Sequence, residues 1–445
     1  LRSRGLGDVY KRQEDFMVRN AFTAGIDFTQ YFKNRLYYID VKGMLSSLHG
    51  SAGAITALQN SVAHYYQRAS SADYLGVDPT RRSLTGTGGY VKVGRKGNAK
   101  WNFSETFTWS SPGFDLNDMG YMKETDYLMN ETEIMYRQTD IWKIFRYNAF
   151  TLSQKNMWNY GGTPFSNNAS LRWQSMTMNR YEWDVKETFA WNWLDSRLLR
   201  GGPDVRFGSY FLTSAKFNTD KAKRMMFMLK YEGDHNFEGN RFNTISPSLT
   251  FRLGNHVYLS GQLDYAWNTD EMQYVATTSP LSSSSLAPYY YVMGHMDQKT
   301  YGLTLKLQVN VTPDISIQFY GAPFTSIAKY DDFKLAADTK SHTFENRFQR
   351  IDPDHLTYVD GVYTIGEGAG QMPFRNPDFR FNEFRSNLVA RWEYLPGSTL
   401  YFVWEHRMSN RDNWYSSGWG SNLDRMWGLP ATNTFMIKMN YWFNL

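Results

Sequence analysis

The last eleven residues of the chain alternate between apolar and polar side chains almost without error. One face of an extended segment would carry six apolar side chains: Phe435, Ile437, Met439, Tyr441, Phe443 and Leu445. On the edge of a soluble sheet such a face promotes aggregation, whereas a membrane barrel needs one face toward lipid and a polar face toward its lumen. The segment therefore predicts a membrane strand, with a buried strand of a soluble sandwich as the alternative.

The composition also favours a membrane barrel. Aromatic residues make up 17% of the chain, yet the mean hydropathy is −0.56 and only 42% of the residues are hydrophobic. Barrels combine a wet lumen with aromatic girdles at both interfaces, which gives this mixture. The absence of cysteine excludes a disulfide framework and thiolate zinc sites. The net charge of +5 is small, and the basic residues are scattered, so no nucleic-acid partner is expected.

The crossing elements are expected to be strands. No apolar run reaches the roughly 18 to 20 residues of a membrane helix, and residues 1–30 contain no signal-peptide pattern. The opening Leu1–Gln13 has no strand pattern and resembles linker read-through, so we expect a non-native leader at 1–13 and a barrel domain over 14–445. The predicted location is the outer membrane of a Gram-negative bacterium, with outer-membrane lipid and the barrel-insertion machinery as partners.

Very short and rather long connections alternate along the chain. The short ones read as tight turns by composition and lie near residues 32–34, 95–98, 139–142, 179–182, 218–223, 254–255, 312–314 and 395–397. The long ones cover approximately 46–84, 110–127, 156–167, 195–207, 233–243, 268–300, 324–380 and 408–432. Short turns at one rim and long loops at the other are typical of periplasmic and extracellular sides. The prediction is an all-β fold, an antiparallel transmembrane β-barrel.

Several strands show the two-faced pattern clearly. Between residues 301 and 311, the odd positions are mostly leucine and valine, and the even positions include Lys306 and Gln308. Two strands depart from this alternation, because Glu105 and Glu187 lie on otherwise aromatic faces. A carboxylate at mid-bilayer costs on the order of 2 kcal/mol, so these glutamates either sit at an interface or mark strands whose faces are inverted.

The strand count is odd. About 17 strands conflict with the even number usual for bacterial barrels, and the last strand must run toward the periplasm. We therefore expect at least one strand before the first, near Phe22–Phe28, and a barrel that does not close with these strands alone. Within the first long loop, Ala54, Leu58, Val62 and Tyr65 of Ser51–Arg68 have helical spacing and predict a short amphipathic helix that packs on the barrel mouth.

Six segments resemble one family in order: AITALQNSVAHYYQR, SLTGTGGYVKVG, WSSPGFDLNDMGYMKETDYL, DSRLLRGGPDVR, MDQKTYGLTLKLQVNVTPDISIQFYGAPF and FRSNLVARWEYLPGSTLYFVWEHR. The family is the outer-membrane β-barrel domain of unknown function found C-terminal to a family-nine-like carbohydrate-binding module. The resemblance covers Arg19 to Leu445, and its most specific part is Arg391–Leu400, supported by Arg200–Pro203. It implies a signal peptide, the sugar-binding module and further strands, all absent here. The run Ser282–Ser285 departs from the family pattern.

The sequence carries no catalytic signature, such as HExxH, GxSxG or a Walker loop. The resemblance implies no catalytic residues, and no cofactor is expected. Gly366, Gly368 and Gly370 read as a flexible loop. Paired acids offer calcium ligands or, as we prefer, solvated loop carboxylates: Asp115 with Asp118, Asp331 with Asp332, and Asp352 with Asp354.

Four aromatic residues in one glycine- and asparagine-rich loop are candidate ligand contacts, because aromatic faces stack on sugar rings: Trp414, Tyr415, Trp419 and Trp427. Interfacial or loop packing is the competing interpretation. We expect a channel or surface protein linked to carbohydrate binding or uptake, with glycans as partners. The alternatives are an adhesion or assembly barrel with an occluded pore, and an outer-membrane hydrolase.

Overall fold

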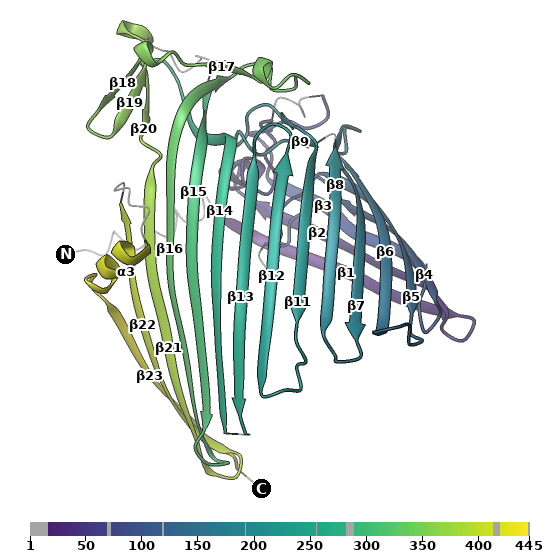
Figure 1. Cartoon of the computed structure of the whole chain (residues 1–445). Helices are drawn as coiled ribbons and strands as arrows, with labels where there is room; N and C mark the ends of the chain where they lie inside the picture. Colours follow the sequence, from purple (N-terminus) through teal and green to yellow (C-terminus); the bar gives the residue numbers. More distant parts are fainter. Residues whose placement is uncertain are drawn as a thin grey trace, which may run out of the picture.

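The computed structural model describes residues 17–443, apart from 69–72, 118–119, 192, 255, 282–288 and 413–418. A single large antiparallel sheet dominates this part of the chain and curves as the wall of a barrel does (Figure 1). The predicted leader Leu1–Gln13 lies outside the described residues. No described helix is long and apolar enough to cross a membrane, which says nothing about a β-barrel.

Strands that follow one another in the sequence lie side by side in the sheet. The first eight are β1 to β8: Val18–Phe32, Tyr37–Gly50, Ser83–Arg95, Trp101–Ser110, Tyr127–Gln138, Phe145–Trp158, Pro164–Thr177 and Glu182–Trp191. β8 pairs with β11, and the sheet continues through β11 to β16: Tyr210–Asn218, Met225–Asn236, Arg241–Leu253, Val257–Thr278, Tyr290–Asn310 and Ile315–Ala336. β16 pairs with β21, and the last three strands are β21 to β23: Phe379–Leu395, Ser398–Asp412 and Thr432–Asn440.

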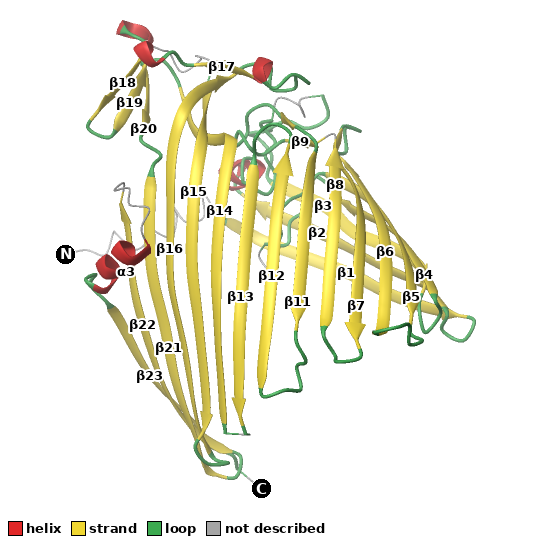
Figure 2. Cartoon of the chain, viewed as in Figure 1, coloured by secondary structure: helices red, strands yellow, loops and turns green. Residues whose placement is uncertain are grey.

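Among the described residues the sheet has eighteen strands, and one of them, β17 (Phe348–Arg350), pairs only with the end of β16. Seventeen strands therefore succeed one another, which confirms the prediction of about 17. The smaller elements lie in the connections (Figure 2): α2 (Ala52–Gln59), β9 (Trp193–Asp195), β10 (Val205–Phe207), η2 (Glu345–Arg347), η3 (Pro353–His355), β18 (Leu356–Val359), β19 (Val362–Ile365), η4 (Gly368–Gly370), β20 (Met372–Arg375) and α3 (Trp419–Trp427).

The eight predicted short turns all join neighbouring strands at one rim of the sheet. The predicted long loops are wrong in extent, because many strands continue past the point where the lipid-type alternation stops. β14, β15 and β16 contain 22, 21 and 22 residues, although 268–300 and 324–380 were expected to be loops. Backbone hydrogen bonds between strands form whether or not one face is apolar. A strand can therefore be longer than the segment in which apolar and polar residues alternate.

The two faces of the sheet differ in chemistry. On β15, Leu305 is 40% exposed and lies on the outward face, where its neighbours across the ladder are Gly261 and Gly321. Gln308 and Lys306 lie on the opposite, lumenal face, as the alternation predicts. On β23, Phe435, Ile437 and Met439 are outward and exposed, although the strand ends at Asn440 rather than at Leu445.

The sheet is not closed. Within the described residues no ladder joins β1 to β23, and both are edge strands. β1 runs toward the rim of the short turns, as β23 does, so a direct pairing between them would be parallel. Antiparallel closure of this sheet needs an odd number of additional strands, as the parity of the sequence pattern predicts.

We predict that charge is tolerated on one face of β15 and not on the other. Leu305→Arg places a cation against lipid and is expected to cost roughly 2 to 4 kcal/mol at mid-bilayer. Gln308→Arg faces the lumen and should be nearly silent. The measurement is the fraction of heat-modifiable folded protein in membranes. Equal losses in the two variants would refute the assignment of faces.

Candidate ligand pocket in the lumen

The loops at the rim opposite the short turns fold inward onto the lumenal face. Helix α2 begins at Ser51, whose side-chain oxygen accepts a hydrogen bond from the N–H of Ala54 at 3.0 Å. It ends at Gln59, well before the predicted Arg68, because the chain turns at Asn60. Ile55 packs against Tyr66 of the same loop and against Leu84 of β3 on the lumenal wall. This agrees with the packing role predicted for the helix. Val62, expected on the packed face, is 65% exposed, because the helix stops before it.

His64 fastens this segment to the next loop. Its Nδ1 lies 2.9 Å from the carbonyl oxygen of Pro112, and its Nε2 lies 3.0 Å from the carboxylate of Asp115. The hydroxyl oxygen of Thr125 lies 3.2 Å from the same Nδ1, so the buried ring joins three partners. Burial alone would raise the pKa of Asp115, but hydrogen bonds from His64 and from the N–H of Asn117 outweigh it and hold that pKa below its usual range.

Two buried arginines connect further loops. Arg68 donates to the Asp126 carboxylate at 2.6 Å and to the Ser196 hydroxyl at 3.0 Å. The Tyr74 hydroxyl donates to the same carboxylate at 2.6 Å.

The other arginine, Arg347, is 1% exposed and forms two bonds with the Glu238 carboxylate, at 2.7 and 2.9 Å. It also donates to the carbonyl oxygen of Arg206. A buried pair that loses one partner leaves an uncompensated charge, so these contacts fix the inward position of the loops.

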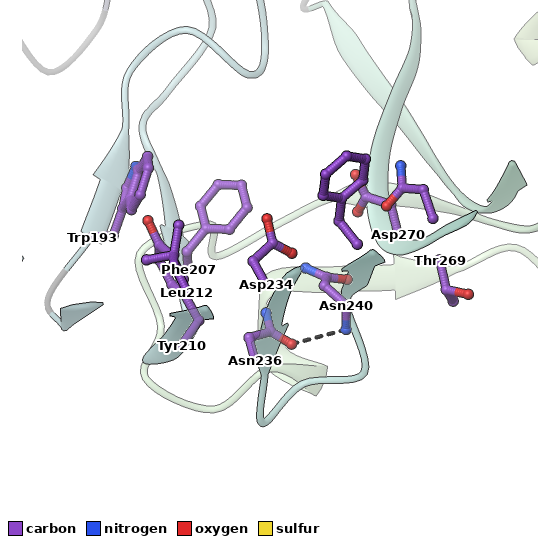
Figure 3. A pocket seen from close by; sticks show the side chains of 11 residues that line it. Trp193, Phe207, Tyr210, Leu212, Asp234, Asn236, Asn240, Thr269 and Asp270 are labelled. Atoms are coloured by element: carbon purple, nitrogen blue, oxygen red, sulfur yellow. Dashed lines mark hydrogen bonds between the residues drawn. The ribbon is translucent and has the colours of Figure 1, made fainter. Parts of the chain in front are cut away.

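A cavity of about 330 Å³ lies on the lumenal side between β9 and β14 (Figure 3). Its lining combines aromatic rings with carboxylates and amides: Trp193, Phe207, Tyr210, Leu212, Asp234, Asn236, Asn240, Phe242, Asn268, Thr269 and Asp270. We call it the lumenal pocket. The ring centroid of Trp193 lies 5.1 Å from that of Tyr210 and 5.9 Å from that of Phe207, which makes an aromatic corner.

The polar side of the lumenal pocket is held in place by short local bonds. The backbone N–H of Asn240 donates to the side chain of Asn236 at 2.9 Å (Figure 3). Asp270 follows Thr269, the last residue of β14 that pairs with β13. Its carboxylate accepts a hydrogen bond from the N–H of Met272 at 2.8 Å. The pocket thus includes a half-buried carboxyl group.

Two further cavities share walls with the lumenal pocket. One of about 570 Å³ shares Trp193, Tyr210 and Leu212 with it and adds charged side chains of both signs: Lys123, Glu124, Glu131, Lys155, Lys186, Asp195 and Arg197. Another of about 320 Å³ shares Leu212, Asp234 and Phe242. The three cavities share lining residues and therefore lie next to one another along the lumenal face.

The predicted loop aromatics lie elsewhere. Trp414 and Tyr415 are outside the described residues, and Trp419 and Trp427 stand at opposite ends of α3. The ring of Trp427 meets Phe384 edge-on at 4.9 Å, and α3 contacts β16, β21 and β22. Phe384 is on the outward face, so Trp427 is remote from the lumenal pocket. Whether these residues bind a ligand stays a prediction.

The predicted acid pairs differ in their surroundings. Asp115 is buried against His64, while Asp118 lies outside the described residues. Asp332 lies 3.6 Å from Lys334 and 3.8 Å from Arg350. The side chain of Asp352 accepts from the N–H of Asp354, as a helix cap does. In the part of the chain that the structure describes, no group of three or more metal-ligating side chains occurs.

A family model described as Domain of unknown function (DUF5916) matches residues 49–445. The chain belongs to this family. In the DUF5916 chain, the Arg391–Leu400 segment that carries the most specific resemblance forms the hairpin of β21 and β22. The family description names no activity and no carbohydrate-binding module, so the sugar association remains a proposal.

Comparison of the DUF5916 chain with curated proteins found no significant match. Among solved structures, the siderophore receptor PirA from Acinetobacter baumannii aligns with 94% of this chain and 70% of its own, at 10% sequence identity and a TM-score of 0.38.

Sequence reasoning missed every residue of the lumenal pocket. Trp193, Tyr210, Asp234 and Asp270 stand on different strands of the DUF5916 sheet, spread over about eighty residues. Each is an ordinary lumenal or rim side chain in its own strand. Only the order and register of the strands bring them together, and no local motif records that.

We predict that His64→Ala releases the inward loops. The substitution leaves the buried Asp115 carboxylate without the ring nitrogen that faces it, which costs about 3 kcal/mol. Backbone amides of residues 52–68 should exchange hydrogen faster and become accessible to protease, while the sheet stays folded. His49→Ala, at an exposed position, is the matched control and should change neither readout. Unchanged exchange in His64→Ala would show that the dyad does not hold the loop.

Proposed function

We propose that this chain forms the wall of an outer-membrane β-barrel protein that binds carbohydrate in its lumen, as a channel or receptor for glycan uptake. Two-faced strands support the location: outward side chains such as Leu305 and Ile437 are apolar and exposed, and the lumenal side chains are polar. We propose that lipid of a Gram-negative outer membrane surrounds the outward face of the sheet. The exposed apolar face of β23 is the proposed contact for barrel-insertion machinery.

The lining of the lumenal pocket is the observation that supports carbohydrate as the class of ligand. Its aromatic corner of Trp193, Phe207 and Tyr210 offers an apolar platform, and Asp234 with the nearby amides offers acceptors and donors. A sugar ring has apolar C–H faces and a rim of hydroxyl groups, so it matches both sides of such a site. A purely apolar ligand would bring no donor to the carboxylates of Asp234 and Asp270, each of which accepts a backbone hydrogen bond and has further acceptor positions.

A second candidate function follows from the inward loops. The bonds of Arg347 with Glu238 and of Arg68 with Asp126 hold chain segments in the lumen. This arrangement favours an adhesion or assembly barrel with an occluded pore, whose loops make the contacts. In that case the loop aromatics Trp414, Tyr415, Trp419 and Trp427 are the proposed ligand contacts.

Bilayer recordings separate the two candidates. If the lumenal pocket binds sugar in an open pore, reconstituted protein should conduct ions, and added neutral oligosaccharides should block the current in a concentration-dependent way. We predict that Trp193→Ala weakens this block about tenfold or more, since stacking on an aromatic ring is lost, and leaves ion conductance intact. Trp183→Ala removes the same ring from the outward face and should leave the block unchanged.

The outcomes identify the surviving function. A protein that never conducts but retains glycans on cells, with retention lost when Trp414, Trp419 and Trp427 are all replaced by Ala, would favour the occluded barrel. Conductance without any sugar block in the unmodified protein would overturn the lumenal sugar site.

A further inference from the structure

Two strands carry a glutamate at the middle of an aromatic outward face. On β4 the outward side chains are, in order, Trp101, Phe103, Glu105, Phe107 and Trp109. On β8 they are Trp183, Val185, Glu187, Phe189 and Trp191. The outward assignment follows from the exposed rings of Phe103, Phe107 and Phe189. The faces are therefore not inverted, and both glutamates lie between aromatic girdles.

Each glutamate has one threonine partner on the next strand. The hydroxyl of Thr132 on β5 donates to Glu105 at 2.6 Å, and the hydroxyl of Thr213 on β11 donates to Glu187 at 2.7 Å. A carboxylate offers about four acceptor positions, so one donor leaves most of them available. Both carboxylates can accept further donors from outside the sheet.

Side-chain amides extend the polar surface beside Glu105. The ladders place Thr132 opposite Gln154, Asn130 opposite Asn156, and Asn156 opposite Asn167. Gln154 is exposed and the three asparagines are half-buried. The described residues provide no side-chain hydrogen bond for any of these four amides. We call this surface the outward polar patch: Glu105, Asn130, Thr132, Gln154, Asn156 and Asn167.

The outward polar patch conflicts with a lipid environment. Hydrocarbon has no donors or acceptors, so each polar group left without a partner there is destabilising. Four amides and a carboxylate on four adjacent strands therefore make this sector of the wall a poor lipid contact. In membrane proteins, side-chain amides of this kind form hydrogen bonds between neighbouring helices.

We propose that the outward polar patch is the interface with a second copy of this chain. The proposal rests on the outer-membrane location proposed above. Each amide carries two donors and one acceptor, so a patch dominated by amides complements itself across a two-fold axis. The amides of the partner copy also supply donors to Glu105. A cationic partner would suit the carboxylate but would leave the amide donors of Gln154 and the asparagines without acceptors.

Single-cysteine cross-linking tests this interface, because the native chain contains no cysteine and hence no background reaction. Gln154→Cys lies at the centre of the patch. In outer membranes, oxidation or a short bis-maleimide should convert most of this variant to a covalent dimer. Leu305→Cys is the matched control, since Leu305 is exposed on a different sector of the outward face, and it should stay monomeric under the same conditions.

A second variant separates assembly from folding. Replacing Glu105, Gln154 and Asn156 by Leu should retain the heat-modifiable barrel, because these residues belong to none of the described apolar clusters, but should shift the native species from dimer to monomer. Native mass spectrometry in detergent gives the mass directly. A monomeric unmodified protein, or cross-links from Gln154→Cys only to a different protein, would overturn the proposal.

Membrane fractionation keeps this test distinct from the proposed function. Protein absent from the outer-membrane fraction would refute the location, and the interface with it. Protein present there without a Gln154→Cys dimer would refute the interface alone. The sugar block of ion conductance does not depend on the patch, so it can succeed while the interface fails.

Discussion

The backbone ladder is the constraint on which the rest of the structure depends. In lipid every N–H and C=O must find a partner within the protein, and an antiparallel sheet provides one for each interior strand. Seventeen successive strands meet this requirement with nearest-neighbour pairings alone, so the chain needs no crossover. The same constraint gives side chains their alternation, because neighbouring residues on a paired strand face opposite sides. Lipid-facing and lumenal chemistry follow from that geometry.

Buried ion pairs hold the inward loops together with small apolar clusters. His64 with Asp115, Arg68 with Asp126, and Arg347 with Glu238 each join segments that are far apart in the sequence. Buried ionic pairs are weak sources of net stability, but they are specific about which groups meet. Arg68 also bonds Ser196, and Arg347 bonds the carbonyl oxygen of Arg206, so these two arginines hold the β9–β10 hairpin whose Trp193 lines the lumenal pocket. The proposed ligand site thus depends on ion pairs that lie outside its lining.

The fold was far easier to predict from the sequence than the site. Period-two alternation, as in residues 301–311, reports strand and face together, and the short turns are marked by glycine, proline and asparagine. Strand ends were predicted less well: β14 continues to Thr278, where side chains such as Met272 and Val275 pack in apolar clusters that the lipid-type alternation does not reveal. Helix α3 was missed, since Trp419–Trp427 begins in a glycine-rich stretch that resembles a loop. Asp234 and Asp270 were out of reach because their proximity depends on the register of three strands.

The length of β14, β15 and β16 has a consequence for what the cell surface presents. At about 3.4 Å per residue, a strand of 22 residues spans roughly 70 Å, and even when tilted it exceeds the apolar band of about 25 Å by a wide margin. The small sheet of β18, β19 and β20 is attached at the far end of these strands (Figure 1). In an outer membrane this end stands well clear of the lipid headgroups. Antibodies, phages and proteases approaching the cell would meet this projecting sheet before they reached the barrel rim.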